Sequence, residues 1–167
     1  GNNPRACAKK VFELFSAKGK YVKIAFIEGD NLIDAVNNNV FNDSYLKNSE
    51  NGLSFDTVRD HVKSANAYTG FPSIVEALEQ GAEIVICGRA SDSAITIAPI
   101  VHELGWDYED YDKLGSAMIA AHVIECGAQA TGGNFTDWQT ITNWDDFGFP
   151  NIEVYEDGSF DVFKHKG

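Results

Sequence analysis

The chain has few basic residues and no long apolar run. Its 13 Lys and Arg residues stand against 25 Asp and Glu residues, which gives a formal net charge of −12 over 167 residues. An acidic surface repels nucleic-acid phosphates and anionic lipid headgroups. No apolar stretch approaches the roughly 18 to 20 residues that cross a bilayer. We therefore expect no nucleic-acid partner and no membrane partner.

Cysteine is also scarce, and its spacing excludes the common cysteine-based sites. Cys7, Cys87 and Cys126 are an odd number, lie far apart and include no CxxC pair, so neither a disulfide framework nor a zinc ribbon is indicated. The first ten residues, GNNPRACAKK, lack the apolar core of a signal peptide. These features predict a cytoplasmic protein. Because the chain starts without Met and a helix is expected almost at once, we also expect it to be a fragment of a longer protein.

What is present is enough apolar material for one core. The chain is 44% hydrophobic and 12% aromatic, whereas disordered chains combine high net charge with few aromatic residues. Its length fits one domain. We therefore predict a single folded domain over residues 1–167.

Short apolar segments alternate with stretches of helical periodicity. Strands are expected at 22–27 (VKIAFI) and 83–87 (EIVIC), and helices at 4–18, 31–36, 72–80, 93–104 and 111–126. Parallel strands need crossover connections of this kind. The pattern predicts an α/β fold with a mainly parallel sheet and covering helices in Rossmann-like layers.

Two further segments have distinct compositions. Residues 37–52 are rich in Asn and Ser, which predicts a long surface loop. Near the end, IEVYEDGSFDVF alternates with period two around Asp157-Gly158, which predicts an antiparallel β-hairpin.

Ligands in open parallel sheets gather beyond the carboxyl ends of the strands. Glu28 and Asp30 follow the first expected strand, on either side of a glycine that permits close approach. Both are candidate substrate-binding residues. The alternative for Asp30 is a structural role as the cap of the next helix.

A stronger anion-binding candidate follows the second expected strand. Arg89, Ser91, Asp92 and Ser93 lie between that strand and a helix start, which places a cation and two hydroxyls where an anion is stabilised. The alternative is helix capping by Ser91 or Asp92, with Arg89 paired to a carboxylate. The segment matches neither GxGxxG nor the P-loop, so the cofactor is unknown and no dinucleotide or nucleoside triphosphate signature is present.

The helix at 111–126 and the loop after it carry the remaining candidates. Spacings of three and four place His122, Glu125 and Cys126 on one side of the helix. His122 with Glu125 is a candidate catalytic acid/base pair. For Cys126, a core or helix-packing role is favoured over metal ligation. The other histidines show no spacing that completes a metal site. In the loop, small and polar residues favour contact with a ligand over an ordinary structural turn; these candidates are Thr131, Gly132, Gly133 and Asn134.

Six strings occur in an order that is specific to one family. NPRACA, EGD, SANAYTG, GRASDSA, HELGW and HVIECGAQATGGNFTDW resemble the acyclic terpene utilisation (AtuA-like) family, and the resemblance runs from Asn3 to about Phe163. Asn66, within SANAYTG, joins the candidate substrate-binding residues. Family members carry additional sequence before and after this span, so the chain resembles the middle of the family domain.

The resemblance implies a role in the breakdown of acyclic terpenoids through branched acyl-CoA intermediates. We expect an enzyme of hydratase, lyase or isomerase type whose small-molecule substrate is a CoA thioester. The alternative is a non-catalytic subunit that contacts a partner enzyme through the acidic aromatic segment from Trp106 to Tyr111. A homo-oligomer, or assembly with other parts of the same domain, also remains open.

Overall fold

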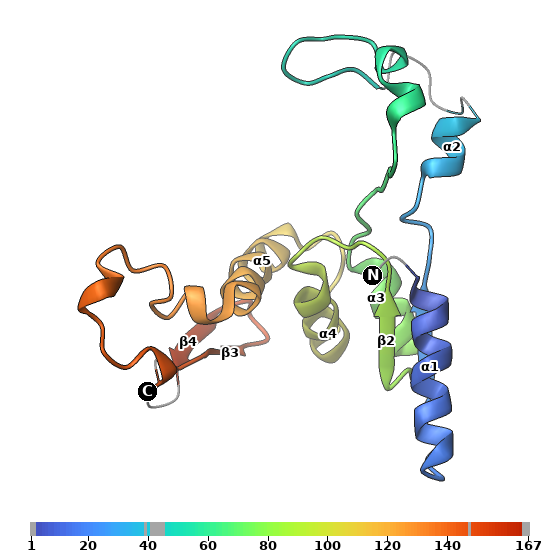
Figure 1. Ribbon diagram of the computed structural model, residues 1–167. Coiled ribbons are helices and arrows are strands. Elements are labelled where there is room, and N and C mark those ends of the chain that lie inside the picture. The colour runs from blue at the N-terminus through green and yellow to red at the C-terminus, as the bar shows by residue number, and fades with distance from the viewer. Residues whose placement is uncertain (1–2, 39, 41–45, 147, 165–167) are drawn as a thin grey trace. The chain divides into compact units, whose positions relative to one another are not determined.

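The computed structural model describes residues 3–38, 40, 46–146 and 148–164. Figure 1 follows the chain from the N-terminal helix to the C-terminal hairpin. The chain divides into two compact units. Unit 1 comprises residues 1–70 and 81–90, and unit 2 comprises residues 71–80 and 91–167. We describe each unit separately.

Unit 1 is built on one helix and a pair of parallel strands. Helix α1 (Pro4–Ala17) begins where the Asn3 side chain accepts a hydrogen bond from the Ala6 amide at 3.0 Å, and proline occupies its first turn. Strand β1 (Ile24–Ile27) pairs in parallel with β2 (Ile84–Cys87), with Ile24 opposite Ile84. Helix α1 packs beside both strands.

The rest of unit 1 lies between β1 and the start of unit 2. It contains the short helix α2 (Ile33–Asn37) and two 3₁₀ turns, Phe55–Thr57 and Arg59–His61. Within the predicted surface loop, residues 39 and 41–45 lie outside the described residues. The described end of that loop closes through an antiparallel bridge between Lys47 and Ser54.

The described residues of unit 2 form three α-helices, a hairpin and the short 3₁₀ turns Gly127–Gln129, Trp138–Thr140 and Trp144–Asp146. The helices are α3 (Pro72–Glu79), α4 (Ala94–Leu104) and α5 (Tyr111–Cys126). Alanines at the contact surfaces of α4 and α5, such as Ala98 and Ala120, are fully buried and let the two helices approach closely. The other buried apolar residues of this unit are Ile74, Val75, Ala77, Ala94, Ile97, Val101, Trp106, Ala117 and Ala121.

The hairpin is formed by β3 (Pro150–Val154) and β4 (Phe160–Lys164), with Val154 opposite Phe160. It packs on α5, where the Ser116 hydroxyl donates to the Gly158 carbonyl at 2.5 Å. The indole N–H of Trp106 donates to the Glu156 carbonyl at 3.2 Å. The side chain of Trp106 is only 6% exposed. The expectation that Trp106 belongs to a contact surface was therefore wrong, because this residue completes the core and holds the hairpin turn.

The described strands confirm the mixed α/β composition and the closing hairpin. They form one parallel pair in unit 1 and one antiparallel pair in unit 2. The Rossmann-like layering stays a prediction. Among the described residues, no helix combines the length and apolar character needed to cross a membrane.

Two glycines of unit 2 are expected to respond in opposite ways to alanine substitution. Gly158 has φ +91°, and a Cβ there would meet the Lys113 side chain at 3.0 Å. Gly158→Ala should lower the free energy of unfolding by about 1–2 kcal/mol. Gly115 lies within α5 with no atom within 4 Å of an added Cβ, so Gly115→Ala should raise it by about 0.5–1 kcal/mol. Urea unfolding of both variants measures the difference, and equal effects of the two substitutions would contradict this description of the hairpin turn.

Candidate functional site

The candidate site of unit 1 lies at the carboxyl ends of β1 and β2. Because these strands are parallel, the segments that follow them emerge at the same edge. A third segment, residues 65–69, runs beside both. The Ala67 amide donates to the Asp30 carbonyl at 2.8 Å, and the Thr69 amide donates to the Arg89 carbonyl at 3.0 Å. Three segments that are distant in sequence are thereby joined at one edge.

Asp30 is the buried centre of this edge, with 5% of its surface exposed. Its carboxylate accepts hydrogen bonds from the Arg89 backbone amide and from the Asn66 side-chain amide, the latter at 3.0 Å. The Arg89 amide lowers the pKa of Asp30; burial opposes this shift and Asn66 reinforces it. The alternative role as a helix cap is not observed, since the N-cap of α2 is Leu32.

Gly88 makes room for this carboxylate. A Cβ placed on Gly88 would overlap the carboxyl group of Asp30. No other residue type fits at this position without displacing Asp30. The glycine after β2 therefore lets the Arg89 amide approach the buried anion.

Arg89 extends outward from the same turn. Its guanidinium carbon lies 4.9 Å from the centre of the Tyr68 ring, and its Nη2 donates a hydrogen bond to the Tyr68 hydroxyl. The alternative pairing with a carboxylate is not observed, because the described residues give Arg89 no ion pair. Cation–π contact orients the guanidinium without neutralising its charge. Arg89 therefore presents an oriented positive charge on an exposed side chain.

Glu28 is held by a residue that the sequence analysis did not select. Arg5 Nη2 lies 2.6 Å from Glu28 Oε2, and the Arg5 Nε reaches both carboxylate oxygens at 3.3 Å. The hydrogen bond from Arg5 lowers the pKa of Glu28. The Arg5 guanidinium also lies over the Phe26 ring, at 4.9 Å. This exposed pair joins the start of α1 to the segment after β1.

In unit 2, the predicted capping residues of α4 do not cap it. The N-cap is Ser93, which is buried and makes no side-chain capping hydrogen bond. Ser91 accepts a hydrogen bond from the Ala94 amide only through its backbone carbonyl, at 2.9 Å. Asp92 is exposed and lies near enough to Cys126 to contribute to raising the pKa of that thiol. The start of α4 therefore approaches the end of α5.

His122 and Glu125 are both exposed on α5. The Glu125 carboxylate accepts a hydrogen bond from the Cys126 thiol, with Sγ 3.7 Å from Oε2. Burial, followed by the Glu125 charge, raises the pKa of Cys126, which favours the neutral thiol. The hydrogen bonds of the described residues include none between His122 and Glu125. The acid/base role of this pair stays a prediction.

The loop after α5 is tightly wound. The Thr131 hydroxyl donates to the Gly148 carbonyl at 2.9 Å, and the Asn134 amide donates to the Gln129 side chain at 3.3 Å. Gly133 lies against the Ala128 carbonyl, which a Cβ would approach to 2.9 Å. The hydrogen bond from Thr131 links the start of this loop to Gly148. Two of the candidates, Gly133 and Asn134, border a hollow of about 520 Å³ that is otherwise lined by Phe135, Thr136, Trp138 and Trp144.

The candidates thus fall into two sets. Unit 1 brings together Glu28, Asp30, Asn66 and Arg89, and adds Arg5 and Tyr68, which the sequence analysis missed. The family strings could have indicated both residues, since NPRACA contains Arg5 and SANAYTG contains Tyr68. Unit 2 holds Ser91, Asp92, Ser93, His122, Glu125, Thr131, Gly132, Gly133 and Asn134. Within the described part of the chain, no three His, Cys, Asp or Glu side chains gather as metal ligands.

Replacing Asp30 with Asn tests whether the buried carboxylate organises the edge. The variant loses an ionised acceptor of the Arg89 amide, and its own amide group adds donors where acceptors are needed. We expect Asp30→Asn to lower the free energy of unfolding at pH 7 by about 1–3 kcal/mol.

The lowered pKa of Asp30 also predicts how the free energy of unfolding depends on pH. Because the pKa of Asp30 is lower in the folded state than the ordinary value of 3.8, its contribution is present above pH 3.8 and is lost as the pH falls through the folded-state pKa. Asp30→Asn should therefore destabilise the protein at pH 7. Below pH 4, the free energy of unfolding of this variant should fall less steeply with decreasing pH than that of the wild type. Denaturant unfolding between pH 2.5 and 7 measures this, with Asp34→Asn as an exposed control. A parallel pH profile in wild type and Asp30→Asn would contradict the assignment.

Comparison with known proteins supplies a family. Neither the curated proteins nor the solved structures include a match. The family model described as acyclic terpene utilisation family protein AtuA matches residues 1–167. Four of the strings that carry the resemblance, NPRACA, EGD, SANAYTG and GRASDSA, supply the residues assembled at the edge of β1 and β2. The chain belongs to the acyclic terpene utilisation family AtuA.

Proposed function

We propose that the protein is an enzyme of acyclic terpene utilisation that binds a branched acyl-CoA substrate through the anionic part of the coenzyme. The observation that carries this proposal is Arg89, whose charge is oriented by Tyr68 at the carboxyl edge of a parallel strand pair. In a chain with net charge −12, an anionic ligand needs such a local cation to offset the overall repulsion. Arginine binds phosphate through two parallel hydrogen bonds.

The proposed reaction is a hydration, lyase or isomerisation step. In unit 2, His122 is the proposed proton-transfer group, with Glu125 as its partner carboxylate. In the loop after α5, the backbone amides of Thr131 and Gly133 already donate to the Ala128 carbonyl. The backbone amides of Gly132 and Asn134 are therefore the proposed donors for a thioester oxygen. Redox chemistry is not part of the proposal, because no dinucleotide fingerprint occurs in the sequence.

We propose that both units belong to one cytoplasmic α/β domain with Rossmann-like layers. The chain passes between the units at residues 70–71, 80–81 and 90–91, whereas few connections normally cross a domain boundary. The cysteines, all three of which lie in the described part of the chain, form no disulfide. Free cysteines are typical of cytoplasmic proteins.

The second candidate is a non-catalytic subunit that contacts a partner enzyme. Helix α5 favours it, because Tyr111, Met118 and Ile119 are 75%, 52% and 62% exposed on that helix. Large apolar side chains at such spacing form a stripe that suits protein contact. A homo-oligomer would use the same stripe.

The anion site is tested by thermal-shift titration of the protein with CoA and with branched acyl-CoAs. Specific binding raises the melting temperature by mass action. Arg89→Ala should remove a charge-assisted contact of about 1.5–3 kcal/mol, and so weaken CoA affinity by about tenfold or more. Arg89→Lys should retain part of the affinity because it keeps the charge without the planar fork.

Lys10→Ala is the matched control for this titration. Lys10 lies on α1 of the same unit, is largely exposed and pairs with Glu13 at 3.4 Å, so its removal changes the net charge without touching the site. The proposal predicts wild-type affinity for Lys10→Ala. Equal weakening by Lys10→Ala and Arg89→Ala would show a general charge effect and contradict a specific anion site.

The catalytic role of His122 predicts a separate effect. Because His122 is exposed, His122→Gln should leave the melting temperature unchanged while lowering turnover of a branched acyl-CoA by about 10²–10⁴-fold. Mass spectrometry of the reaction mixture, searching for hydrated, cleaved and isomerised products, measures turnover. Unchanged product formation by His122→Gln would remove His122 from the mechanism.

A further inference from the structure

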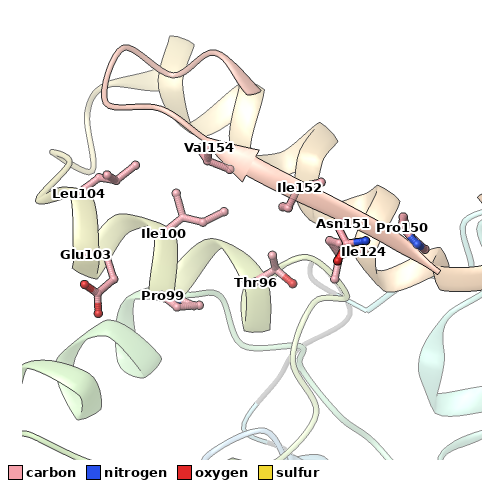
Figure 2. Close-up of a pocket in the computed structure, with 10 residues that line it drawn as sticks. All are labelled: Thr96, Pro99, Ile100, Glu103, Leu104, Ile124, Pro150, Asn151, Ile152 and Val154. Atoms are coloured by element: carbon pink, nitrogen blue, oxygen red, sulfur yellow. The ribbon is translucent and has the colours of Figure 1, made fainter. Parts of the chain in front are cut away.

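Unit 2 contains an apolar groove that the proposed anion site does not use. It lies between α4, the end of α5 and β3, and has a volume of about 520 Å³ (Figure 2). Small-molecule sites in proteins typically have volumes of about 300–1,000 Å³. All of its residues belong to unit 2. They are Thr96, Pro99, Ile100, Glu103, Leu104, Ile124, Pro150, Asn151, Ile152 and Val154.

The groove is lined by aliphatic rather than aromatic side chains. In Figure 2, Ile100 of α4 and Ile152 and Val154 of β3 point toward one another across it. Each of these side chains is only partly buried. Methyl groups without flat ring faces suit an alkyl chain better than a planar ring, because stacking has no partner here.

The length of the groove suits a chain of medium length. From Thr96 to Leu104, α4 advances about 12 Å at 1.5 Å per residue. An extended chain gains about 1.2 Å per bond, since a residue of three backbone bonds spans at most about 3.3–3.6 Å. The groove therefore accommodates roughly ten bonds of an extended aliphatic chain.

The two ends of the groove differ in polarity. Thr96 and Asn151 lie together at one end, which is the N-terminal end of α4, and Leu104 lies at the other (Figure 2). The helix dipole makes the Thr96 end the more favourable one for a polar or anionic headgroup. Glu103, the residue before the last one of α4, repels an anionic headgroup at the Leu104 end. The polarity thus sets one direction for a bound amphiphile.

We propose that this groove binds the acyclic aliphatic chain of a ligand of about ten carbons, with its polar headgroup at Thr96 and Asn151. The identification of that chain as the substrate's own rests on the proposed function, whereas binding in the groove does not. Chain burial stabilises the complex by removing methylene groups from water.

The test uses methyl-resolved NMR of the whole chain, with citronellol, decanol and decanoate as probes. Ile100, Ile124 and Ile152 line the groove, whereas Ile95 is 58% exposed on the same helix and does not line it. We expect saturable shifts of the first three methyl signals and none for Ile95. Shifts confined to other isoleucines, or no saturable shift, would overturn the proposal.

A pair of variants separates filling of the groove from general disturbance of α4. Ile100→Trp places a bulky side chain in the groove and should weaken probe binding about tenfold or more. Ile95→Trp makes the same change on the exposed face of α4 and should bind the probes as wild type does. Equal affinities of the two variants would contradict the proposal. Concentration-dependent shifts of the groove methyls without probe would show that a second copy occupies the groove instead.

Chain length supplies an independent readout. Each added methylene should tighten binding by about fourfold until the groove is full, at about ten carbons, and should add little beyond it. Affinity that keeps rising with length would indicate nonspecific partitioning and would contradict a groove of defined length.

The anion site and the groove fail separately. Arg89→Ala should leave binding of the uncharged citronellol unchanged. Citronellol binding without CoA binding would retain the groove and reject the proposed function, and the reverse result would reject the groove alone.

Discussion

The buried carboxylate of Asp30 is the interaction on which the polar edge of unit 1 depends. Removing a charge from water is costly unless hydrogen bonds replace the lost hydration. The Arg89 amide and the Asn66 side chain supply that replacement, and Gly88 provides the space that the approach requires. The Asp30 carboxylate thereby holds together the segments after β1 and β2 and the segment that contains Asn66.

The backbone and the side chain of Arg89 have different environments in this arrangement. The backbone of Arg89 faces inward to Asp30, while its guanidinium lies outside against Tyr68. A buried anion therefore positions an exposed cation, and no ion pair among the described residues neutralises that cation. The proposed binding of an anionic ligand rests on this exposed cation.

Local sequence signals predicted most of the secondary structure. The Asp157-Gly158 turn, the start of α3 and the end of α5 depend on residues adjacent in sequence, and each lies where it was expected. The predicted strands and helices agree with the observed elements to within about two residues, which is the usual uncertainty of element boundaries. The burial of Trp106 was missed because its partner, the Glu156 carbonyl, lies 50 residues away.

The site itself was predictable only as a set of isolated segments. Asp30 was selected as a capping or binding residue, yet its structural partners are 36 residues away at Asn66 and in the turn after β2. Tyr68 and Arg5 were missed because their partners, Arg89 and Glu28, are distant by 21 and 23 residues. Periodicity carries no information on such pairs. The family strings did indicate which residues belong together, since residues of four strings meet at the edge of β1 and β2.

The most direct test is an NMR titration that observes the Arg89 side-chain N–H signals and the backbone amides of unit 1 while CoA is added. If the edge of β1 and β2 is an anion site, the Arg89 Nε–H signal and the amides of residues 28–30, 66–69 and 88–90 should shift together and saturate with one dissociation constant. If saturating CoA leaves these signals in place, or shifts amides elsewhere in the chain instead, the polar edge is a structural device and not the ligand site.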